Sequence, residues 1–333
     1  MSVDVLEKSP TAHPSSQASQ ALKITPTNPV IGAEVSGLDL REELDAATIA
    51  KLRRKLLKHK VLFFRDQAIS DADQIRFSRY FGKITPAHPI TNGLTEQIEI
   101  MENVKSLQHH HRKSELDEVQ QQQLRANSKG RRTRGWHTDI TFVANPTSIT
   151  FLRGTEIPEF GGDTLWANLE ALYDSLSPAI QGLVDTLTAI HGRDDARAGF
   201  TPKPRLDGRP TGPYLAEHSL VRVHPETGRK SLFLSPGFIR YIVGLNDGES
   251  NTLLEYLIEE LAGRADLQTR FRWTPNSLAV WDNRATSHWG PVDALQLDNE
   301  RIVHRTTIDP DFTTGPSGFK SRQVLGDTFY TLD

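Results

Sequence analysis

Two side chains able to bind a metal ion stand close together in the segment WHTD at residues 136–139. His137 and Asp139 are two positions apart, so on an extended strand both would point to the same face. One imidazole and one carboxylate fill only part of a coordination sphere. Two histidines with one carboxylate make a facial set that suits Fe(II) and leaves positions for a chelating cosubstrate and oxygen. A second histidine from elsewhere in the chain would therefore complete a candidate iron site.

The pattern His-x-Asp is a weak indication alone, because the chain has 12 histidines and a chance match is expected about once. A second match, to His-x-Glu, begins at His224 in the segment HPETG at residues 224–228. Its proline and glycine favour a turn, so we predict a hairpin turn in which His224 is structural. His288 is the candidate third ligand, because it follows the apolar run Leu278–Trp281 and the polar segment DNRATS.

Two arginines offer positive charge in the segment RIVHR, which begins at Arg301. On a strand, Arg301 and Arg305 would share one face. A buried arginine pair needs anionic partners, and a guanidinium group matches a carboxylate or sulfate in bidentate geometry. The alternative is a surface charge pair, and the flanking Ile302 and Val303 do not decide between the two interpretations.

Four segments in the order WHTDITF, GGDTLWAN, WDNRATSH and RIVHRTTI resemble the taurine/alkylsulfate dioxygenase family, over roughly Lys23 to Pro310. The resemblance implies an Fe(II)- and 2-oxoglutarate-dependent dioxygenase on a double-stranded β-helix, which is a jelly-roll fold. Such an enzyme uses O2, converts 2-oxoglutarate to succinate and CO2, and hydroxylates a substrate carbon. Hydroxylation next to a sulfate or sulfonate oxygen gives an unstable product that breaks to an aldehyde plus sulfate or sulfite.

The resemblance also implies roles for individual residues. The implied iron ligands, and with them the catalytic centre, are His137, Asp139 and His288. Thr164 of GGDTLWAN and Arg301 match the groups that hold the distal carboxylate of 2-oxoglutarate. The cosubstrate would therefore be held at one end by these side chains and at its keto acid end by the iron.

Three groups match contacts to the substrate anion: the second arginine, Arg305, which also faces the cosubstrate, His88 in the segment PAHP, and the backbone N–H of Ile140. Taurine-specific members place Asp and Asn just before the tryptophan of WHTD, to hold the substrate amine. This chain has Arg132 and Arg134 there, and positive side chains repel an ammonium group. We therefore expect an amine-free anion rather than taurine.

Two alternatives remain open at this point. Arg305 and His88 would serve a carboxylate as well as a sulfate, so the substrate could be an aryloxyalkanoate or another carboxylate. A catalytically silent jelly-roll binding protein is the non-enzyme alternative, which the presence of all three ligand types and both arginines disfavours.

The elements that must position these residues follow from apolar spacing. An amphipathic helix is predicted over Ala46–Leu57, a buried strand over Val61–Phe64, and a helix from the cap Ser70 to Phe81. The strands predicted after Trp136 are Ile149–Arg153, Thr164–Ala167, Leu220–Val223, Ser231–Ser235, Ser277–Trp281 and Ile302–Ile308. The helices predicted there are Leu169–Leu176, Ala179–Ile190 and Ser250–Leu261. Many short strands with few helices predict a mainly β fold, a sandwich or jelly roll with helical decoration.

Composition excludes several classes of protein. The chain of 333 residues has no cysteine, which excludes disulfides, zinc fingers, iron–sulfur clusters and thiol nucleophiles. A net charge of -3 argues against general nucleic-acid binding. No run approaches ~18 apolar residues, and the N-terminus lacks the apolar region of a secretory signal. We expect a cytoplasmic homo-oligomer whose partners are small anionic substrates, with no nucleic-acid or membrane partner.

Two segments differ in composition from the rest. Residues 1–20 are rich in Ser, Pro, Gln and Ala and are predicted to be a disordered tail. Residues 21–333 are predicted to form a single dioxygenase domain with an insertion at 105–134, which holds eight Lys or Arg and three Asp or Glu. This basic insertion is interpreted either as a mobile lid over an anionic substrate or as a solvated linker.

Overall fold

The computed structural model of the chain describes residues 21–105, 135–193, 205, 207–209, 212–291 and 300–332. The predicted tail at residues 1–20 and residues 106–134 of the predicted insertion lie outside the described residues. Within the described part of the chain, no helix has the length and apolar character needed to cross a bilayer.

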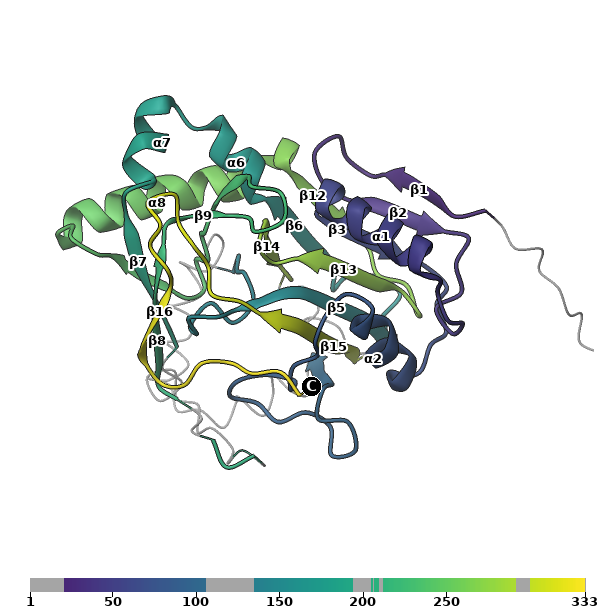
Figure 1. The fold of residues 1–333 in the computed structure, drawn as a ribbon. Coiled ribbons are helices and arrows are strands. Elements are labelled where there is room, and N and C mark those ends of the chain that lie inside the picture. The colour runs from purple at the N-terminus through teal and green to yellow at the C-terminus, as the bar shows by residue number, and fades with distance from the viewer. Residues whose placement is uncertain are drawn as a thin grey trace, which may run out of the picture.

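The larger sheet has seven strands in the order β1-β2-β3-β13-β5-β15-β4 (Figure 1). They are β1 (Lys23–Pro26), β2 (Ala33–Ser36), β3 (Val61–Phe64), β4 (Met101–Lys105), β5 (Thr147–Glu156), β13 (Leu278–Asp282) and β15 (Arg301–Pro310). All neighbours are antiparallel except β2 and β3, which are parallel. The strand that carries both arginines, β15, therefore lies beside β5, which follows the WHTD segment closely in the chain.

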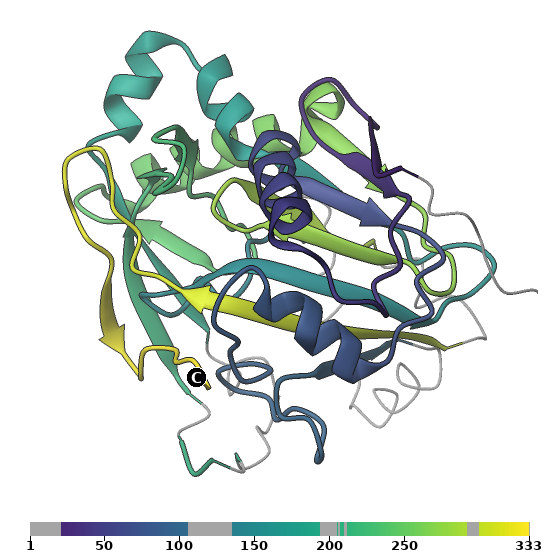
Figure 2. The ribbon, with the colours of Figure 1, turned by 45° about the vertical axis from the view of Figure 1, so that its right-hand side comes forward.

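Two helices cover one face of this sheet, α1 (Ala46–His59) and α2 (Asp71–Arg79) (Figure 2). Leu56 of α1 and Phe77 of α2 share a buried apolar cluster with Phe151 of β5. Both helices were predicted, and α2 begins at the predicted cap, because the Ser70 side chain accepts a hydrogen bond from the backbone N–H of Asp73. The four-residue strand β3 is buried throughout, as a continuous apolar run predicts.

The remaining strands form three smaller antiparallel sheets, with the orders β12-β6-β14, β11-β7-β8-β16 and β10-β9. Their strands are β6 (Thr164–Asn168), β7 (Thr188–Arg193), β8 (Tyr214–Ser219), β9 (Val221–Val223), β10 (Lys230–Leu232), β11 (Ile239–Ile242), β12 (Gln268–Phe271), β14 (Thr286–Trp289) and β16 (Arg322–Leu325). Trp166 of β6 packs edge-on against Trp281 of β13, with ring centroids 5.5 Å apart. A buried aromatic layer therefore joins the seven-stranded sheet to the sheet of β12, β6 and β14.

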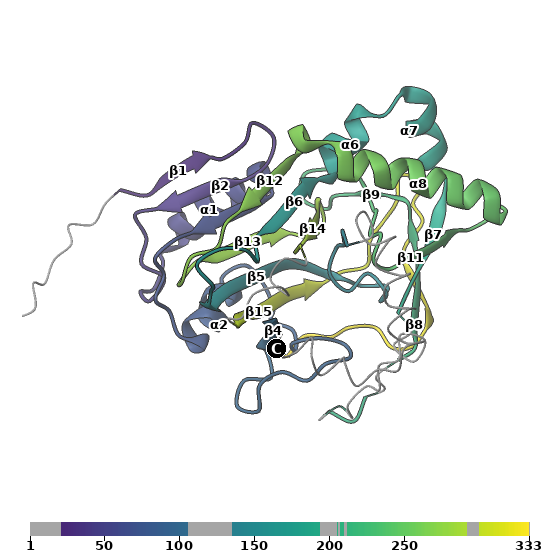
Figure 3. The same ribbon diagram turned by 180° about the vertical axis from the view of Figure 1, so that it is seen from behind.

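Three helices and a short 3-10 turn lie beside the smaller sheets (Figure 3). They are α6 (Leu169–Ser175), α7 (Pro178–Val184), α8 (Asp247–Gly263) and the 3-10 turn Ala265–Leu267. Leu257 of α8 and Leu172 of α6 are fully buried in one apolar cluster with Leu232 of β10. The mainly β character with helices at the periphery, predicted from the sequence, is confirmed.

One predicted helix is wrong in its second half. A helix was expected over Ala179–Ile190, but α7 ends at Val184 and β7 begins at Thr188. Thr188 and Ile190 pair with Ser219 and Glu217 of β8. Ladder pairing with a distant strand outweighed the helical spacing of the apolar residues, as tertiary context often does.

Candidate active site

The three residues predicted as metal ligands lie together. The ligand atoms of His137, Asp139 and His288 are all within 4.8 Å of one another. Nε2 of His288 is 3.9 Å from Oδ1 of Asp139, and the two imidazole rings have centroids 4.1 Å apart. Two imidazoles and one carboxylate at this spacing form a donor set that fits Fe(II).

The local backbone differs from the strand that the sequence predicted. His137 makes a single antiparallel bridge with His288, with N···O distances of 2.9 and 2.7 Å, and the chain then turns at Asp139. Ile140 has a φ of 46°, in the left-handed region that β-branched residues rarely adopt. The bridge fixes His288 directly opposite His137. The turn that follows places the Asp139 carboxylate beside both imidazoles, although Asp139 itself is not part of a strand.

Hydrogen bonds fix the orientation of His137. Its Nδ1 lies 3.0 Å from the carbonyl oxygen of Gly135, so Nδ1 is the protonated nitrogen and Nε2 carries the lone pair that a metal needs. Gly135 is required here, because a Cβ at this position would lie 2.3 Å from Nε1 of Trp289. The side chain of Trp289, the last residue of β14, therefore packs directly against the residue that holds the first ligand in place.

Asp139 is buried and holds its charge through neighbouring groups. Its Oδ1 accepts a hydrogen bond of 2.9 Å from Nη1 of Arg305, and its Oδ2 accepts one of 2.7 Å from the hydroxyl of Thr150. Burial alone would raise the pKa of Asp139, but Arg305 and the two histidines outweigh burial and hold this pKa well below its usual range. The carboxylate is therefore ionised, as a metal ligand must be.

Two supporting residues were missed at the level of sequence. Nδ2 of Asn283 donates to the hydroxyl of Thr150 at 2.7 Å, and Oδ1 of Asn283 accepts from Nε1 of Trp281 at 3.0 Å. This chain of hydrogen bonds orients Thr150 toward Asp139. Two signals in the sequence could have identified them. Thr150 is a polar residue within the predicted strand Ile149–Arg153, and Asn283 follows closely after the apolar run Leu278–Trp281.

The predicted cosubstrate residues meet at one tryptophan. The hydroxyl of Thr164 accepts a hydrogen bond of 3.0 Å from Nε1 of Trp273, and the guanidinium of Arg301 lies 5.5 Å from the centre of a Trp273 ring. Nε of Arg301 also donates to the carbonyl of Gly162 at 2.9 Å. The structure thus brings Thr164 and Arg301 together, and it adds Trp273, which the sequence did not indicate.

The face on which the two arginines lie was predicted correctly. Alternation along β15 places Arg301 and Arg305 on one side, while His304 points to the other side. There His304 hydrogen bonds through Nδ1 to Asp71 at 2.6 Å and through Nε2 to Glu102 at 3.2 Å. The His304 contacts tie α2 to the sheet and take no part in the metal centre, whereas Arg305 reaches Asp139.

His88 lies near Arg305 and is buried. Nη2 of Arg305 donates to the carbonyl of Ala87 at 3.2 Å, and Nδ1 of His88 accepts from the backbone N–H of Ile90 at 3.2 Å. Burial, with Arg305 and Arg193 nearby, holds the pKa of His88 well below its usual range. The ring is therefore neutral with its proton on Nε2, so that His88 can donate a hydrogen bond to an anion.

The His-x-Glu segment that begins at His224 forms the predicted turn. His224 lies at the start of the turn between β9 and β10, where the N–H of Gly228 donates to its carbonyl at 2.9 Å. The side chain is fully buried, with Nε2 3.0 Å from Oδ2 of Asp282. Glu226 pairs instead with Arg53 and Arg284. Neither His224 nor Glu226 belongs to the metal centre.

Residues 22–307 match the model of the taurine catabolism dioxygenase TauD, TfdA family. The chain belongs to this family. The matched range includes every predicted site residue from His88 to Arg305. The predictions of a family of dioxygenase enzymes and of a jelly roll are confirmed. The arginines predicted to exclude taurine, Arg132 and Arg134, lie outside the described residues.

Individual members of the TauD, TfdA family align with nearly the whole chain. An alkylsulfatase from Acinetobacter baylyi is 35% identical over 318 residues, which cover 92% of this chain and 90% of that protein. An alpha-ketoglutarate-dependent sulfate ester dioxygenase from Pseudomonas putida is 33% identical over 311 residues, covering 90% and 94%. The solved structure of a taurine dioxygenase from Burkholderia xenovorans is 36% identical with a TM-score of 0.77, over 92% of this chain and 96% of that one.

Proposed function

We propose that this chain is an Fe(II)- and 2-oxoglutarate-dependent dioxygenase that hydroxylates the carbon next to a sulfate or sulfonate group. One atom of O2 enters the substrate and the other enters succinate, which forms with CO2 from 2-oxoglutarate. The hydroxylated carbon then releases sulfate or sulfite as its C–O or C–S bond breaks, and the carbon leaves as an aldehyde. The observation that carries this proposal is the convergence of two imidazoles and one carboxylate within 4.8 Å, beside Arg305.

In this proposal His137, Asp139 and His288 would hold the iron. When bound, the iron would supply the oxygen chemistry that side chains cannot perform. The protein's own contribution is to keep Asp139 ionised through Thr150 and Arg305, and to fix the His137 ring through Gly135. The binding of metal thus depends on groups already oriented in the folded chain.

Thr164 and Arg301 are proposed to bind the distal carboxylate of 2-oxoglutarate. A hydroxyl and a guanidinium group can grip one carboxylate together. Trp273 supports this proposal, because it touches both residues and places an apolar surface beside them. The methylene groups of the cosubstrate would pack on such a surface.

The substrate anion is proposed to lie against Arg305, the Nε2–H of His88 and the N–H of Ile140. An apolar wall lies next to these groups. The ring of Phe142 is 5.8 Å from His88 and 5.2 Å from Phe238, and Phe238 in turn lies edge-on to His137 at 6.0 Å. Positive and donor groups beside aromatic side chains support a substrate with one anionic head and an apolar body.

A sulfate ester is favoured over a carboxylate by the relatives named alkylsulfatase and sulfate ester dioxygenase. Arg305 and His88 would bind a carboxylate in the same way, so an aryloxyalkanoate is the second candidate substrate. Taurine stays disfavoured on the prediction from Arg132 and Arg134. A cytoplasmic location, a homo-oligomeric state, a single domain over 21–333 and the role of residues 105–134 remain predictions from the sequence.

The deciding experiment supplies the purified protein with Fe(II), ascorbate, O2 and 2-oxoglutarate, and offers one anion at a time. The panel is hexyl sulfate, hexanesulfonate, phenoxyacetate and taurine. We expect succinate and inorganic sulfate in equal amounts with hexyl sulfate. Succinate with phenoxyacetate alone would move the substrate class to carboxylates. No substrate-dependent succinate with any anion, in protein that binds metal, would overturn the proposed activity.

A further inference from the structure

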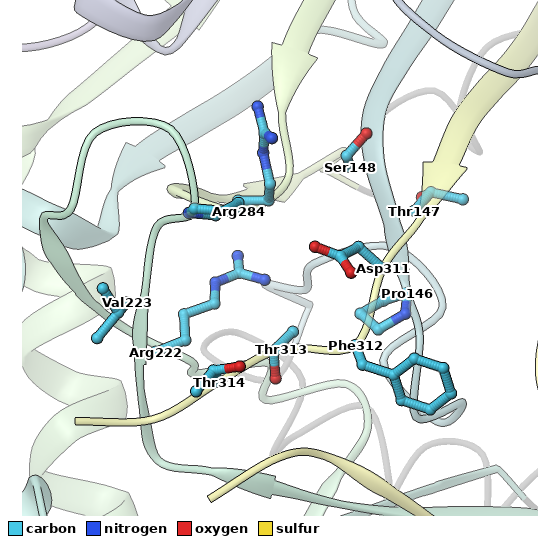
Figure 4. A pocket seen from close by; sticks show the side chains of 11 residues that line it. Pro146, Thr147, Ser148, Arg222, Val223, Arg284, Asp311, Phe312, Thr313 and Thr314 are labelled. Atoms are coloured by element: carbon cyan, nitrogen blue, oxygen red, sulfur yellow. The ribbon is translucent and has the colours of Figure 1, made fainter. Parts of the chain in front are cut away.

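A separate pocket opens where β5 begins, next to the turn that follows β9 (Figure 4). Its volume is about 300 Å³, which lies at the lower end of the range for small-molecule sites. Arg222 projects into its middle, with Asp311 and Phe312 on the opposite side. None of the predicted ligands of the metal or of the cosubstrate lines it.

Arg222 is 2% exposed, yet it has no ion-pair partner among the described carboxylates. Its Nη2 donates to the carbonyl of Asn283, and its guanidinium lies 4.2 Å from the centre of the Phe233 ring. Its Nε has no hydrogen-bond partner. Burial lowers the pKa of Arg222 to about 9. A buried positive charge without an anionic partner is costly to the fold, so this group is suited to receive an anion.

The second arginine of the pocket is already neutralised. Arg284 donates to both oxygens of Asp282 at 2.8 Å and pairs with Glu226 at 2.8 Å. Asp282 also lies 3.0 Å from His224. The carboxylates of Asp282 and Glu226 are therefore engaged with Arg284, and Arg222 is the arginine of the pocket that is left for a ligand.

A hydroxyl group lies on the wall of the pocket that β5 forms. Oγ1 of Thr147 is buried without a hydrogen-bond partner, and Thr147 lines the pocket with Arg222. We propose that this pocket binds a small oxyanion, a sulfate or a carboxylate, through the guanidinium of Arg222, and that rotation of the Thr147 side chain brings its hydroxyl to the same anion. The exposed carboxylate of Asp311 across the pocket would repel a highly charged ligand. The neighbouring Phe312, 44% exposed, offers an apolar surface, so a singly charged anion with a short apolar group fits best.

The pocket is connected to the candidate metal centre through the protein. Arg222 donates to the carbonyl of Asn283, whose Nδ2 donates to Thr150, and Thr150 donates to Asp139. Hydrogen bonds through Asn283 and Thr150 thus link the pocket to the proposed ligand Asp139.

The test is anion binding to the full-length Arg305→Gln protein in the presence of Mn(II) and saturating 2-oxoglutarate, so that the proposed cosubstrate site is occupied and the proposed substrate site has lost its main anion contact. Inorganic sulfate and butyrate are titrated separately by calorimetry at constant ionic strength. We expect saturable binding of one anion per chain, and tighter binding of butyrate would identify a carboxylate with an apolar group as the ligand. Absence of saturable binding of either anion would overturn the proposal.

Substitutions in the Arg305→Gln background locate the site. Thr147→Val should weaken anion binding about 3- to 10-fold, and Arg222→Met should abolish it. Asp311→Asn should tighten it, because a repelling charge is removed. Ser148→Ala is the matched control with unchanged affinity, since the Ser148 hydroxyl lines the same pocket but already donates to Ile308. If Arg222→Met does not fold, Thr147→Val and Asp311→Asn decide, and unchanged affinity in both would overturn the proposal.

Discussion

Nη1 of Arg305 donates a hydrogen bond of 2.9 Å to Oδ1 of Asp139. This contact joins the strand of the two arginines to the turn that carries the proposed carboxylate ligand. Because the same guanidinium also donates to the Ala87 carbonyl next to His88, one side chain links the metal centre with the proposed substrate contact. A change of Arg305 would therefore disturb both groups, whereas Asp139 and His88 can each be changed alone.

Removal of the carboxylate ligand should abolish activity. For Asp139→Ala we expect substrate-dependent succinate formation to fall at least about 100-fold even in saturating Fe(II), because two imidazoles alone hold the metal weakly. Calorimetry with Mn(II) should show the matching loss of metal affinity. Asp266→Ala, a change of an exposed carboxylate, serves as the control. Full turnover in Asp139→Ala would refute the assignment of the ligands.

The cosubstrate and substrate contacts should separate in kinetics. Arg301→Gln should raise the KM for 2-oxoglutarate about 30-fold or more, since a truncated buried charge contact costs ~2–5 kcal/mol. His88→Gln should raise mainly the KM for the sulfate ester. Both constants are measured for each variant by succinate release. An effect of Arg301→Gln on the sulfate ester alone would show that Arg301 does not bind the cosubstrate.

Thr150 should act as a positioning residue. Thr150→Val removes the hydrogen bonds to Asp139 and from Asn283, and we expect metal affinity to fall about 10- to 100-fold, as for other groups that orient a ligand. Thr150→Ser should restore most of the affinity, because the hydroxyl returns. If Thr150→Val lowered only the melting temperature, with metal affinity intact, its role would be structural.

His224 should matter for stability and not for chemistry. His224→Ala removes one hydrogen-bond partner of the buried Asp282, which keeps its bonds to Arg284, and loss of a hydrogen bond to a charged group costs about 1.5–3 kcal/mol. We expect a lower unfolding midpoint in urea, with kcat per folded molecule close to that of the original chain. A specific loss of kcat without loss of stability would contradict this assignment.

Acid should destabilise the fold through two buried histidines. Burial lowers the pKa of His218 to about 3 and that of His191 well below its usual range. Their imidazoles hydrogen bond to the carbonyl and hydroxyl of Thr141. The unfolded chain takes up these protons near pH 6.5, whereas the folded chain does not. The free energy of unfolding therefore decreases as pH falls below about 6.5, by ~1.4 kcal/mol per pH unit for each proton.

The measurement is urea unfolding between pH 6 and pH 4, without added metal. His218→Gln should reduce the slope of unfolding free energy against pH by about one proton. Equal slopes in the two proteins would show that His218 does not control the acid response.

The sequence predicted the residues of the site better than the backbone that presents them. His137, Asp139 and His288 come together, but in a turn after one bridge, since the pairing partner of His137 lies far along the chain. The helix expected to reach Ile190 ended early for the same reason, a ladder with β8. Arg222 had no signal of its own, because the burial of a charged side chain depends on the packing of distant segments.

The bridge between His137 and His288 also determines when the centre can exist during synthesis. β5 is made well before both of its neighbours in the sheet, β13 and β15. An unfinished polypeptide on the ribosome therefore carries β5 with two unpaired edges, which favours association with other chains. It also lacks His288, so the proposed metal site cannot form until β14 has been made. Metal binding at the proposed site is thereby delayed until two segments more than a hundred residues apart have both been made.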